Sequence, residues 1–315
     1  MTTTTAISPS KSSVTDSPTS PLVIMPISPT LGADVRNVEL VDLVRDKSDV
    51  RVNKIREALN RHLVLRFRNT GLDVDGVAGF AALFGELITE RRNPESYVSA
   101  HSTQFPDRPE VEVISNVVKD GRPVGDKGAH AQIWHMDGSH REKPAAYTLL
   151  YASKAPPKAP ATGFMSTYSL YESLSHEFKA EISQLQVIHS IHNRSQAFWD
   201  FMEGPSASLE KRLNGRTHPL VAVHPTSKRP YVVLPRRRDA LIVGYTPEQS
   251  RMILERVWAA IFNMRETIAI PLGTGDLVLF DNRSVLHNRE GWNASDERVV
   301  LNLGMAPQAP IPAFP

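Results

Sequence analysis

The chain has 315 residues, of which 41% are hydrophobic and 22% charged, and its formal net charge is +2. This composition is ordinary for a globular protein with a sizeable core, and the small net charge gives no general attraction to nucleic acid or a membrane surface. The chain has no cysteine, which excludes disulfides and thiolate metal sites. Any metal must therefore bind to histidine and carboxylate, and we expect a reducing, cytoplasmic location.

The first 20 residues contain twelve Ser or Thr residues and lack the apolar core of a secretory signal. This composition predicts a disordered tail at 1–20. The remaining residues, 21–315, are expected to form a single domain, because large β-rich enzymes reach this length without dividing. No apolar run approaches the roughly 20 residues that cross a membrane.

Hydrophobic periodicity predicts short strands and helices along the rest of the chain. Strands are expected at 22–26, 63–67, 111–117, 145–152, 162–166 and 298–303. Helices are expected at 50–62, 74–84 (ending at Gly85), 169–174, 177–185 and 247–262. The last helix has a clear start, with Thr246 as N-cap, Pro247 at the first position and Gln249 at the third. The segments 268–271 and 277–280 flank a turn and predict a hairpin. The pattern indicates an α+β protein with an all-β core.

The segment Gln132–His140, QIWHMDGSH, places a histidine and a carboxylate two residues apart. On a strand His135 and Asp137 would face the same side and could reach one metal ion. Farther on, His287 follows the sequence Asp281-Asn282-Arg283, and Arg298 comes eleven residues later. Two histidines and one carboxylate are the facial triad of non-haem Fe(II) oxygenases. A single His-x-Asp pair of this kind is also compatible with a hydrogen bond at the surface or in the core.

Several further motifs occur in a consistent order. They are Thr30–Val35 (TLGADV), Ala81–Leu87 (AALFGEL), Trp134–Asp137 (WHMD), Pro156-Pro157 followed by Thr162 and Tyr171–Ser175 (YESLS), Thr217–Val221 (THPLV), His224-Pro225, and Asp281–His287 (DNRSVLH). With these motifs the chain, from about Ile24 to Ala306, resembles the TauD/TfdA-like (taurine dioxygenase) family of Fe(II)- and 2-oxoglutarate-dependent oxygenases.

The resemblance implies a double-stranded β-helix (jelly-roll) core with flanking helices. It implies that His135, Asp137 and His287 bind Fe(II), and that Thr162 and Arg298 hold the far carboxylate of 2-oxoglutarate. The implied reaction consumes O2, oxidises an unactivated C–H bond and releases succinate and CO2. The resemblance also implies that halogenating relatives lose the ligand carboxylate, so the presence of Asp137 favours oxygen insertion or desaturation.

The chain departs from the family pattern at two places. Pro160-Ala161 stands where the family has Gly-Gly-Asp before the threonine, and Asn302 stands where the taurine enzyme has a second arginine that helps hold the sulfonate. We therefore expect a small polar acid, an amino acid or another carboxylate, and not a sulfonate. A cation from Arg236–Arg238 could bind it. The candidate substrate residues, each also compatible with a structural role, are Asn302, Asn116, Gln132, Tyr97 and Phe164.

Two other classes of function share these residues. A metal-dependent hydrolase could use the same ligands, although it normally needs an additional general base or a second metal. A non-catalytic jelly-roll binding protein is the other alternative, and retention of all three ligands with Arg298 argues against it. We expect a homo-oligomer with a small-molecule substrate and with neither nucleic acid nor membrane as a partner.

Overall fold

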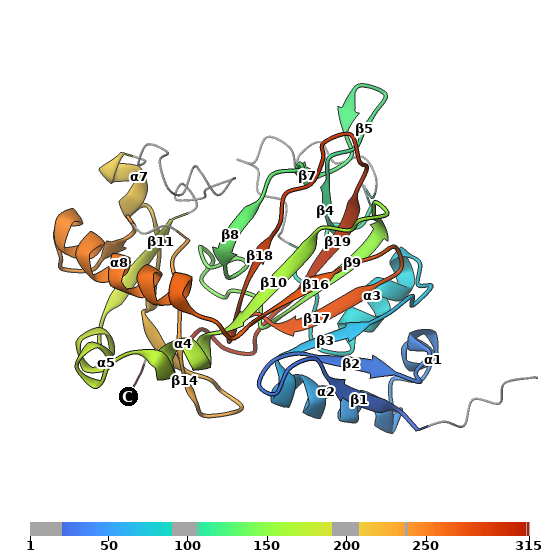
Figure 1. Cartoon of the computed structure of the whole chain (residues 1–315), viewed down its shortest axis with the longest axis horizontal. Helices are drawn as coiled ribbons and strands as arrows, with labels where there is room; N and C mark the ends of the chain where they lie inside the picture. The colour runs from blue at the N-terminus through green and yellow to red at the C-terminus, as the bar shows by residue number, and fades with distance from the viewer. Residues whose placement is uncertain are drawn as a thin grey trace, which may run out of the picture.

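The computed structural model describes residues 21–89, 105, 107–190, 208–236, 239–312 and 314, and two large sheets form its centre (Figure 1). The eight-stranded sheet has the order β1 (Val23–Pro26), β2 (Ala33–Arg36), β3 (Val64–Phe67), β17 (Leu277–Asp281), β9 (Tyr147–Lys154), β19 (Val299–Met305), β4 (Glu112–Ser115) and β7 (Asp126–Lys127). The four-stranded sheet has the order β16 (Thr267–Pro271), β10 (Ala161–Ser166), β18 (Val285–Arg289) and β8 (Gln132–His135).

Consecutive strands of the chain repeatedly pass from one of these sheets to the other. β8, β10 and β18 belong to the four-stranded sheet, whereas β9, β17 and β19 belong to the eight-stranded sheet. Within the sheets the neighbours are antiparallel, apart from the parallel pairs β2–β3 and β4–β7. The alternation places residues that are distant in sequence on facing strands.

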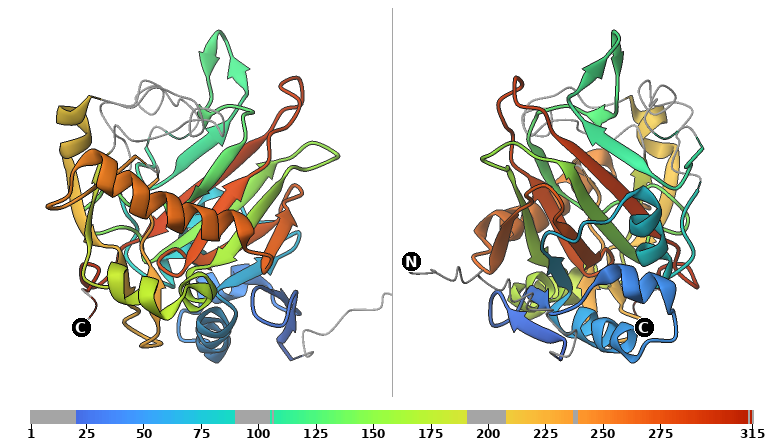
Figure 2. Two further views of the ribbon diagram at one scale, coloured as in Figure 1. Left: turned by 60° about the vertical axis from the view of Figure 1, so that its left-hand side comes forward. Right: turned by 90° about the vertical axis from the view of Figure 1, so that its right-hand side faces the viewer.

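The side chains of β17 alternate between two hydrophobic cores, as the twofold period of a strand requires. Val278 and Phe280 pack in the core that contains Phe164 of β10, so this core lies between the two sheets. Leu277 and Leu279 pack in the second core, on the other face of the eight-stranded sheet. Three helices cover that face: α1 (Leu40–Arg45), α2 (Val50–His62) and α3 (Val74–Ala82) (Figure 2).

A smaller lobe lies beside the two sheets (Figure 1). It has a three-stranded sheet of β12 (Gly215–Pro219), β11 (Gln186–Ser190) and β15 (Leu241–Ile242), and the hairpin β13 (Val221–Val223)–β14 (Pro230–Val232) lies close by. The helices of this part are α4 (Thr167–Ser173), α5 (His176–Ile182), α7 (Leu209–Leu213) and α8 (Pro247–Asn263). A second short hairpin, β5 (Val118–Lys119)–β6 (Arg122–Pro123), projects from the far end of the molecule (Figure 1).

The predicted start of α8 is confirmed. The Thr246 hydroxyl accepts the backbone N–H of Gln249 at 3.2 Å, and the Gln249 side chain accepts the backbone N–H of Thr246 at 2.9 Å. Helix α3 differs from its prediction, because it ends at Ala82 and its C-cap is Leu83 in a right-handed conformation, before Gly85. The local sequence therefore determined the start of a helix more sharply than its end.

The predicted hairpin of 268–271 and 277–280 is wrong, although both segments are strands. β16 pairs with β10, while β17 pairs with β3 and β9 in the other sheet. The connection between them bonds elsewhere: Gly275 N–H donates to the Ala152 carbonyl, and the buried Asp276 carboxylate accepts the N–H groups of Gly273 and Asn69. These tertiary partners separate the two strands.

The predicted tail at 1–20 lies outside the described residues. Within the part of the chain that the structure describes, no helix has the length and apolar character needed to cross a membrane.

Candidate metal centre

His135 and His287 lie directly opposite each other on neighbouring strands. His135 is the last residue of β8, His287 lies in the middle of β18, and the two are paired in the register of these strands. Their ring centres are 4.1 Å apart. The expectation that Asp137 continues the same strand is wrong, because β8 ends at His135 and Asp137 lies in the turn that follows, before Gly138 at φ +67°.

The turn brings the Asp137 carboxylate to the two imidazoles. Its Oδ1 lies 3.6 Å from Nε2 of His135 and 3.9 Å from Nε2 of His287. All three side chains are buried, and their candidate ligand atoms lie within 4.8 Å of one another. Among the described residues this is the one group of three or more His, Cys, Asp or Glu that meets this distance. The predicted triad is thus assembled from β8, the turn after it, and β18.

The ring of His135 is held by a hydrogen bond to its own strand. Its Nδ1–H donates to the carbonyl oxygen of Ile133 at 2.6 Å, which leaves the lone pair of Nε2 directed at Asp137. Burial, followed by the charge of Arg236 and the proximity of His287, holds the pKa of His135 well below its usual range. The imidazole is therefore neutral near pH 7, the form that a metal ion requires.

The backbone of Asp137 is held by the side chain of Asn282. The Asp137 N–H donates to Asn282 Oδ1 at 2.9 Å, and Asn282 Nδ2 donates to the Asp137 carbonyl at 3.0 Å and to the Ala145 carbonyl at 2.9 Å. Asn282 is fully buried. Its amide therefore takes the place of a neighbouring strand beyond the end of β8, and it fixes the turn that carries the carboxylate.

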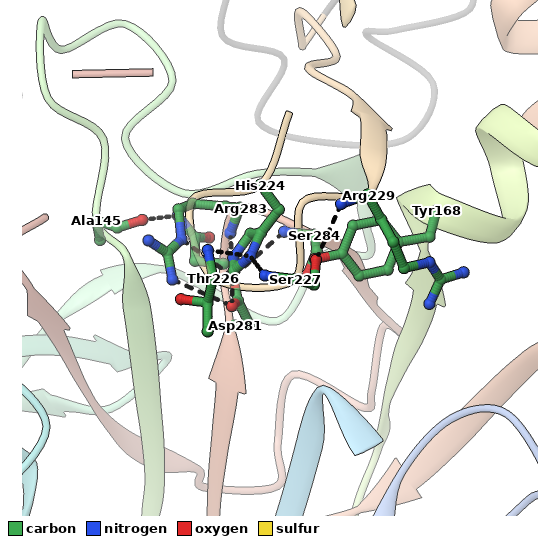
Figure 3. A network of polar contacts seen from close by, with 10 residues as sticks. Ala145, Tyr168, His224, Thr226, Ser227, Arg229, Asp281, Arg283 and Ser284 are labelled. Atoms are coloured by element: carbon green, nitrogen blue, oxygen red, sulfur yellow. Dashed lines mark hydrogen bonds and ion pairs between the residues drawn. The ribbon is translucent and has the colours of Figure 1, made fainter. Parts of the chain in front are cut away.

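A second buried group of histidine and carboxylate surrounds Asp281, next to Asn282 in the chain (Figure 3). The Asp281 carboxylate accepts from Arg283 Nη2 at 3.2 Å, from His224 Nε2–H at 3.0 Å and from the backbone N–H of Ser284 at 3.3 Å. His224 Nδ1 accepts the N–H of Thr226, so its proton is on Nε2.

The Asp281 carboxylate is ionised within this group. Burial alone would raise the pKa of Asp281, but the charge of Arg283 and the hydrogen bond from His224 outweigh burial and lower it below its usual range. With these donors the group is satisfied without a metal.

Arg298 is buried on the inner side of the eight-stranded sheet, at the beginning of β19. Its backbone N–H donates to Asn116 Oδ1 at 3.0 Å, and the Ser115 hydroxyl donates to its carbonyl at 2.9 Å. The side chain is 2% exposed, and its guanidinium lies 5.1 Å from the ring centre of Trp292. Burial lowers the pKa of Arg298 to about 10, so it remains charged at neutral pH. No described carboxylate forms an ion pair with it.

Sequence reasoning missed a second guanidinium at the same indole, that of Arg289, 4.7 Å from the Trp292 ring centre. Arg289 donates to the carbonyls of Gly128 and His130. Burial, followed by the charge of Arg298, lowers the pKa of Arg289 to about 9. Its position two residues after His287 on one strand face was the available signal.

Thr162 lies on β10 directly opposite Arg289 and is 2% exposed. It is thus on the strand beside Arg289.

The predicted substrate residues are dispersed. Phe164 is fully buried and packs against His287, with ring centres 6.4 Å apart, so it holds this imidazole from inside the core. Asn116 holds the backbone of Arg298 and the loop after Trp292. Gln132 is buried on β8, opposite Arg289. Tyr97 lies outside the described residues.

The amide of Asn302 has an unforeseen placement. It donates to Asp137 Oδ2 at 3.2 Å and to Glu112 Oε2 at 3.1 Å.

Comparison with known proteins gives a consistent result over most of the chain. The sequence model described as "Taurine catabolism dioxygenase TauD, TfdA family" matches residues 24–303. Pentalenolactone F synthase of Streptomyces arenae is 28% identical over 279 residues, covering 86% of this chain and 90% of that protein. The alpha-ketoglutarate-dependent 2,4-dichlorophenoxyacetate dioxygenase of Burkholderia sp. (strain RASC) is 28% identical, covering 80% and 84% of the two chains.

Solved structures share the fold. The protein AAD-2, solved in complex with Mn(II) and N-oxalylglycine, has a TM-score of 0.71 at 20% identity and covers 93% of this chain and 100% of its own. A taurine dioxygenase from Burkholderia xenovorans has a TM-score of 0.70 at 23% identity, covering 92% and 93%. At these identities the likeness concerns the arrangement of the strands and helices.

Proposed function

The chain belongs to the taurine catabolism dioxygenase TauD, TfdA family, and on that premise we propose that it is an Fe(II)- and 2-oxoglutarate-dependent oxygenase of a small organic acid. The observation that carries the proposal is the buried convergence of His135, Asp137 and His287. Two imidazole nitrogens and one carboxylate oxygen within 4.8 Å of one another suit Fe(II) and would leave other coordination positions open.

The residues present fit both Fe(II) and 2-oxoglutarate. His135 is neutral with its Nε2 lone pair free of the Ile133 hydrogen bond, and the carboxylate oxygen Oδ1 of Asp137 faces both imidazoles. Arg298 is a buried cation with no described carboxylate as partner. A buried cation of this kind is stabilised by an anion, and a planar guanidinium can bind a carboxylate through two hydrogen bonds.

In the proposed mechanism bound iron, together with 2-oxoglutarate and O2, supplies the oxidation of an unactivated C–H bond with release of succinate and CO2. The chain's own residues would bind and orient the metal and 2-oxoglutarate. His135, Asp137 and His287 would hold the metal, while Arg298 and Thr162 would bind the far carboxylate of 2-oxoglutarate. Asn282 fixes the turn of Asp137 through three hydrogen bonds.

Apolar residues keep water from the protein side of the centre. Phe164 and Phe280 are fully buried, and their rings lie 6.4 Å and 5.0 Å from that of His287. Met136, between the two ligands of the first motif, is 3% exposed. Such surroundings lower the local dielectric and strengthen the polar contacts within the site.

We also propose that the two large sheets are the double-stranded β-helix, or jelly roll, of this family. The passage of successive strands between the sheets supports this. A shared core between the sheets, to which Phe164, Val278 and Phe280 contribute, supports it too.

For the prime substrate we propose a carboxylate and not a sulfonate. Two relatives are named for carboxylates, 2,4-dichlorophenoxyacetate and (S)-phenoxypropionate, although one from Saccharomyces cerevisiae is named for sulfonates. The amide of Asn302 already donates to two carboxylates, which makes its surroundings unfavourable for a further anion. Arg236, whose charge affects the pKa of His135, is the cation that we propose for the substrate.

An anaerobic titration with Fe(II) and 2-oxoglutarate tests the enzyme class. The weak visible charge-transfer band of the chelate should appear in the wild type and disappear in Asp137→Ala. Absence of the band in folded wild-type protein would contradict the proposal.

A screen of small carboxylates, amino acids and alkylsulfonates for stimulated succinate release tests the substrate class. Arg236→Gln should raise the KM for the best carboxylate and leave the Kd of 2-oxoglutarate unchanged. An alkylsulfonate that stimulates release as well as the best carboxylate would contradict the substrate proposal and leave the enzyme class standing.

A further inference from the structure

The side chain of Asn302 lies between two carboxylates, one of which belongs to the metal centre. Its Nδ2 is 3.2 Å from Asp137 Oδ2 and 3.1 Å from Glu112 Oε2, and the residue is 1% exposed. Glu112 is its partner across the β4–β19 pair, whereas Asp137 comes from the turn after β8. One amide nitrogen carries two N–H groups, so Asn302 can donate to both carboxylates at once.

The two neighbours determine which way the amide faces. An ionised carboxylate only accepts hydrogen bonds, and an amide oxygen turned toward it would be repelled. With Glu112 and Asp137 both in contact, the nitrogen must face them. Glu112 therefore orients the amide, and the amide in turn orients Asp137.

We propose that Asn302 is a positioning residue that holds Asp137 through Oδ2 and leaves Oδ1 for the metal. The geometry agrees with this division, because Oδ1 is the oxygen that lies 3.6 Å and 3.9 Å from the two imidazole nitrogens. The inference rests on the proposed metal site and deepens it. In this inference Asn302 holds the carboxylate of Asp137, whereas Asn282 holds its backbone.

The hydrogen bond has a consequence for the open positions of the metal. Carboxylates bind metal ions through one oxygen or through both. The 2-oxoacid and O2 need the positions that a facial triad leaves open, and a second oxygen of Asp137 would occupy one of them. By retaining Oδ2, Asn302 keeps Asp137 a ligand through one oxygen.

A purely structural role, tying β4 to β19, is the competing explanation, and Asn116 provides a matched control for it. Asn116 is also an asparagine that hydrogen-bonds to the β19 end of this sheet, through the N–H of Arg298. It has no hydrogen bond to a metal ligand among the described contacts. Loss of Asn116 should therefore disturb the sheet without disturbing Asp137.

The experiment measures Mn(II) affinity of metal-free protein by electron paramagnetic resonance, without 2-oxoglutarate and without turnover. Asn302→Leu should weaken Mn(II) binding about 10- to 100-fold, the usual effect of losing a partner of a metal ligand, and Asn116→Leu should leave it unchanged. The visible spectrum of the Co(II) protein should change in Asn302→Leu and be unchanged in Asn116→Leu. Circular dichroism verifies folding, and Asn302→Ala replaces the leucine variant if that variant does not fold.

Glu112 provides a second, independent test. Glu112→Leu should weaken Mn(II) binding in the wild-type background and have no further effect in the Asn302→Leu background, because both act through one amide. Additive losses of Mn(II) affinity in the double variant would show that Glu112 does not act through the Asn302 amide. Equal Mn(II) affinity and an unchanged Co(II) spectrum in Asn302→Leu would overturn the whole inference, while failure of the wild type to bind Mn(II) would instead overturn the proposed function.

Discussion

Two buried groups of histidine and carboxylate are linked through Asn282, which follows Asp281 in the chain and hydrogen-bonds to the backbone of Asp137, and they differ in how their polar atoms are satisfied. At Asp281, the carboxylate accepts hydrogen bonds from Arg283, His224 and the backbone, so its charge is compensated within the protein. At Asp137, Oδ1 faces two imidazole nitrogens, at 3.6 Å and 3.9 Å, and Oδ2 accepts a hydrogen bond from Asn302. The same residue types therefore form a hydrogen-bonded structural group in one place and the proposed ligand set in the other.

The difference teaches that burial of a His–Asp pair does not by itself identify a metal site. His224 and Asp281 are as buried as the ligands, and their side chains are 3.0 Å apart. What separates the groups is the kind of neighbour around the carboxylate: an arginine and a hydrogen-bonding histidine at Asp281, and two imidazole nitrogens at Asp137. A buried carboxylate is stabilised by hydrogen-bond donors or by a cation.

The largest expected effect is on activity. His135→Ala, Asp137→Ala and His287→Ala should each abolish turnover, because each removes one of the three ligands. The free energy of unfolding of the metal-free protein should change by only about 1 kcal/mol in Asp137→Ala, as measured by urea denaturation. Near-normal oxygenation by Asp137→Ala at ordinary iron concentrations would show that the ligand assignment is wrong.

The matching substitution in the second group, Asp281→Ala, should lower the free energy of unfolding. Asp281→Ala leaves the Arg283 guanidinium buried without its carboxylate, and breaking such a pair costs about 3–5 kcal/mol. Urea denaturation should show this loss, in contrast to Asp137→Ala. If both alanine variants lost equal stability, the distinction between a structural and a ligand group would not hold.

Arg298 extends the comparison to a buried cation for which the described residues provide no carboxylate in an ion pair. Arg298→Met should weaken 2-oxoglutarate binding roughly 10- to 150-fold, because a charged hydrogen-bonded contact contributes about 1.5–3 kcal/mol. Binding of the prime substrate should weaken less. Arg298→Lys should restore only part of the affinity, since it lacks the two-pronged guanidinium. Calorimetric titration measures the affinities for 2-oxoglutarate and for the prime substrate. Equal weakening of these two affinities in Arg298→Met would contradict the assigned role.

The low pKa of Asp281 predicts an acid-dependent loss of stability. A carboxyl whose folded pKa is depressed contributes stability above its unfolded pKa, about 3.9, and this stability is lost as pH falls toward the folded value. The free energy of unfolding should therefore fall between pH 5 and pH 3. In Asp281→Asn the fall should be smaller by about 1 kcal/mol. Parallel pH profiles would show that Asp281 does not titrate in this way.

The smallest effect is expected for the N-terminal tail. Removal of residues 1–20 should leave both the melting temperature and the activity unchanged, because the segment has few apolar residues to bury. A fall of several degrees, or a loss of turnover, would show that the tail contacts the body of the protein or the site.

Much of the local structure could be predicted from the sequence. Helix α2 spans the predicted 50–62, and the capping residues before α8 act as expected, because both depend on neighbours within one turn. The strands with which β16 and β17 pair could not be predicted. Short-range signals favoured a hairpin, but the connecting turn bonds to residues that are distant in sequence. Its Gly275 N–H donates to the Ala152 carbonyl, and its Asp276 carboxylate accepts the Asn69 N–H.

By itself the sequence determined which residues could be ligands, since the order of the motifs around His135, Asp137 and His287 carries that information. Only the tertiary structure decided how each carboxylate and amide is used. The sequence suggested a substrate role for Asn302, yet its amide faces Glu112 and Asp137. The physical reason is that a hydrogen bond depends on the distance and direction between two groups, and here both are set by segments 165 and 190 residues apart in the chain.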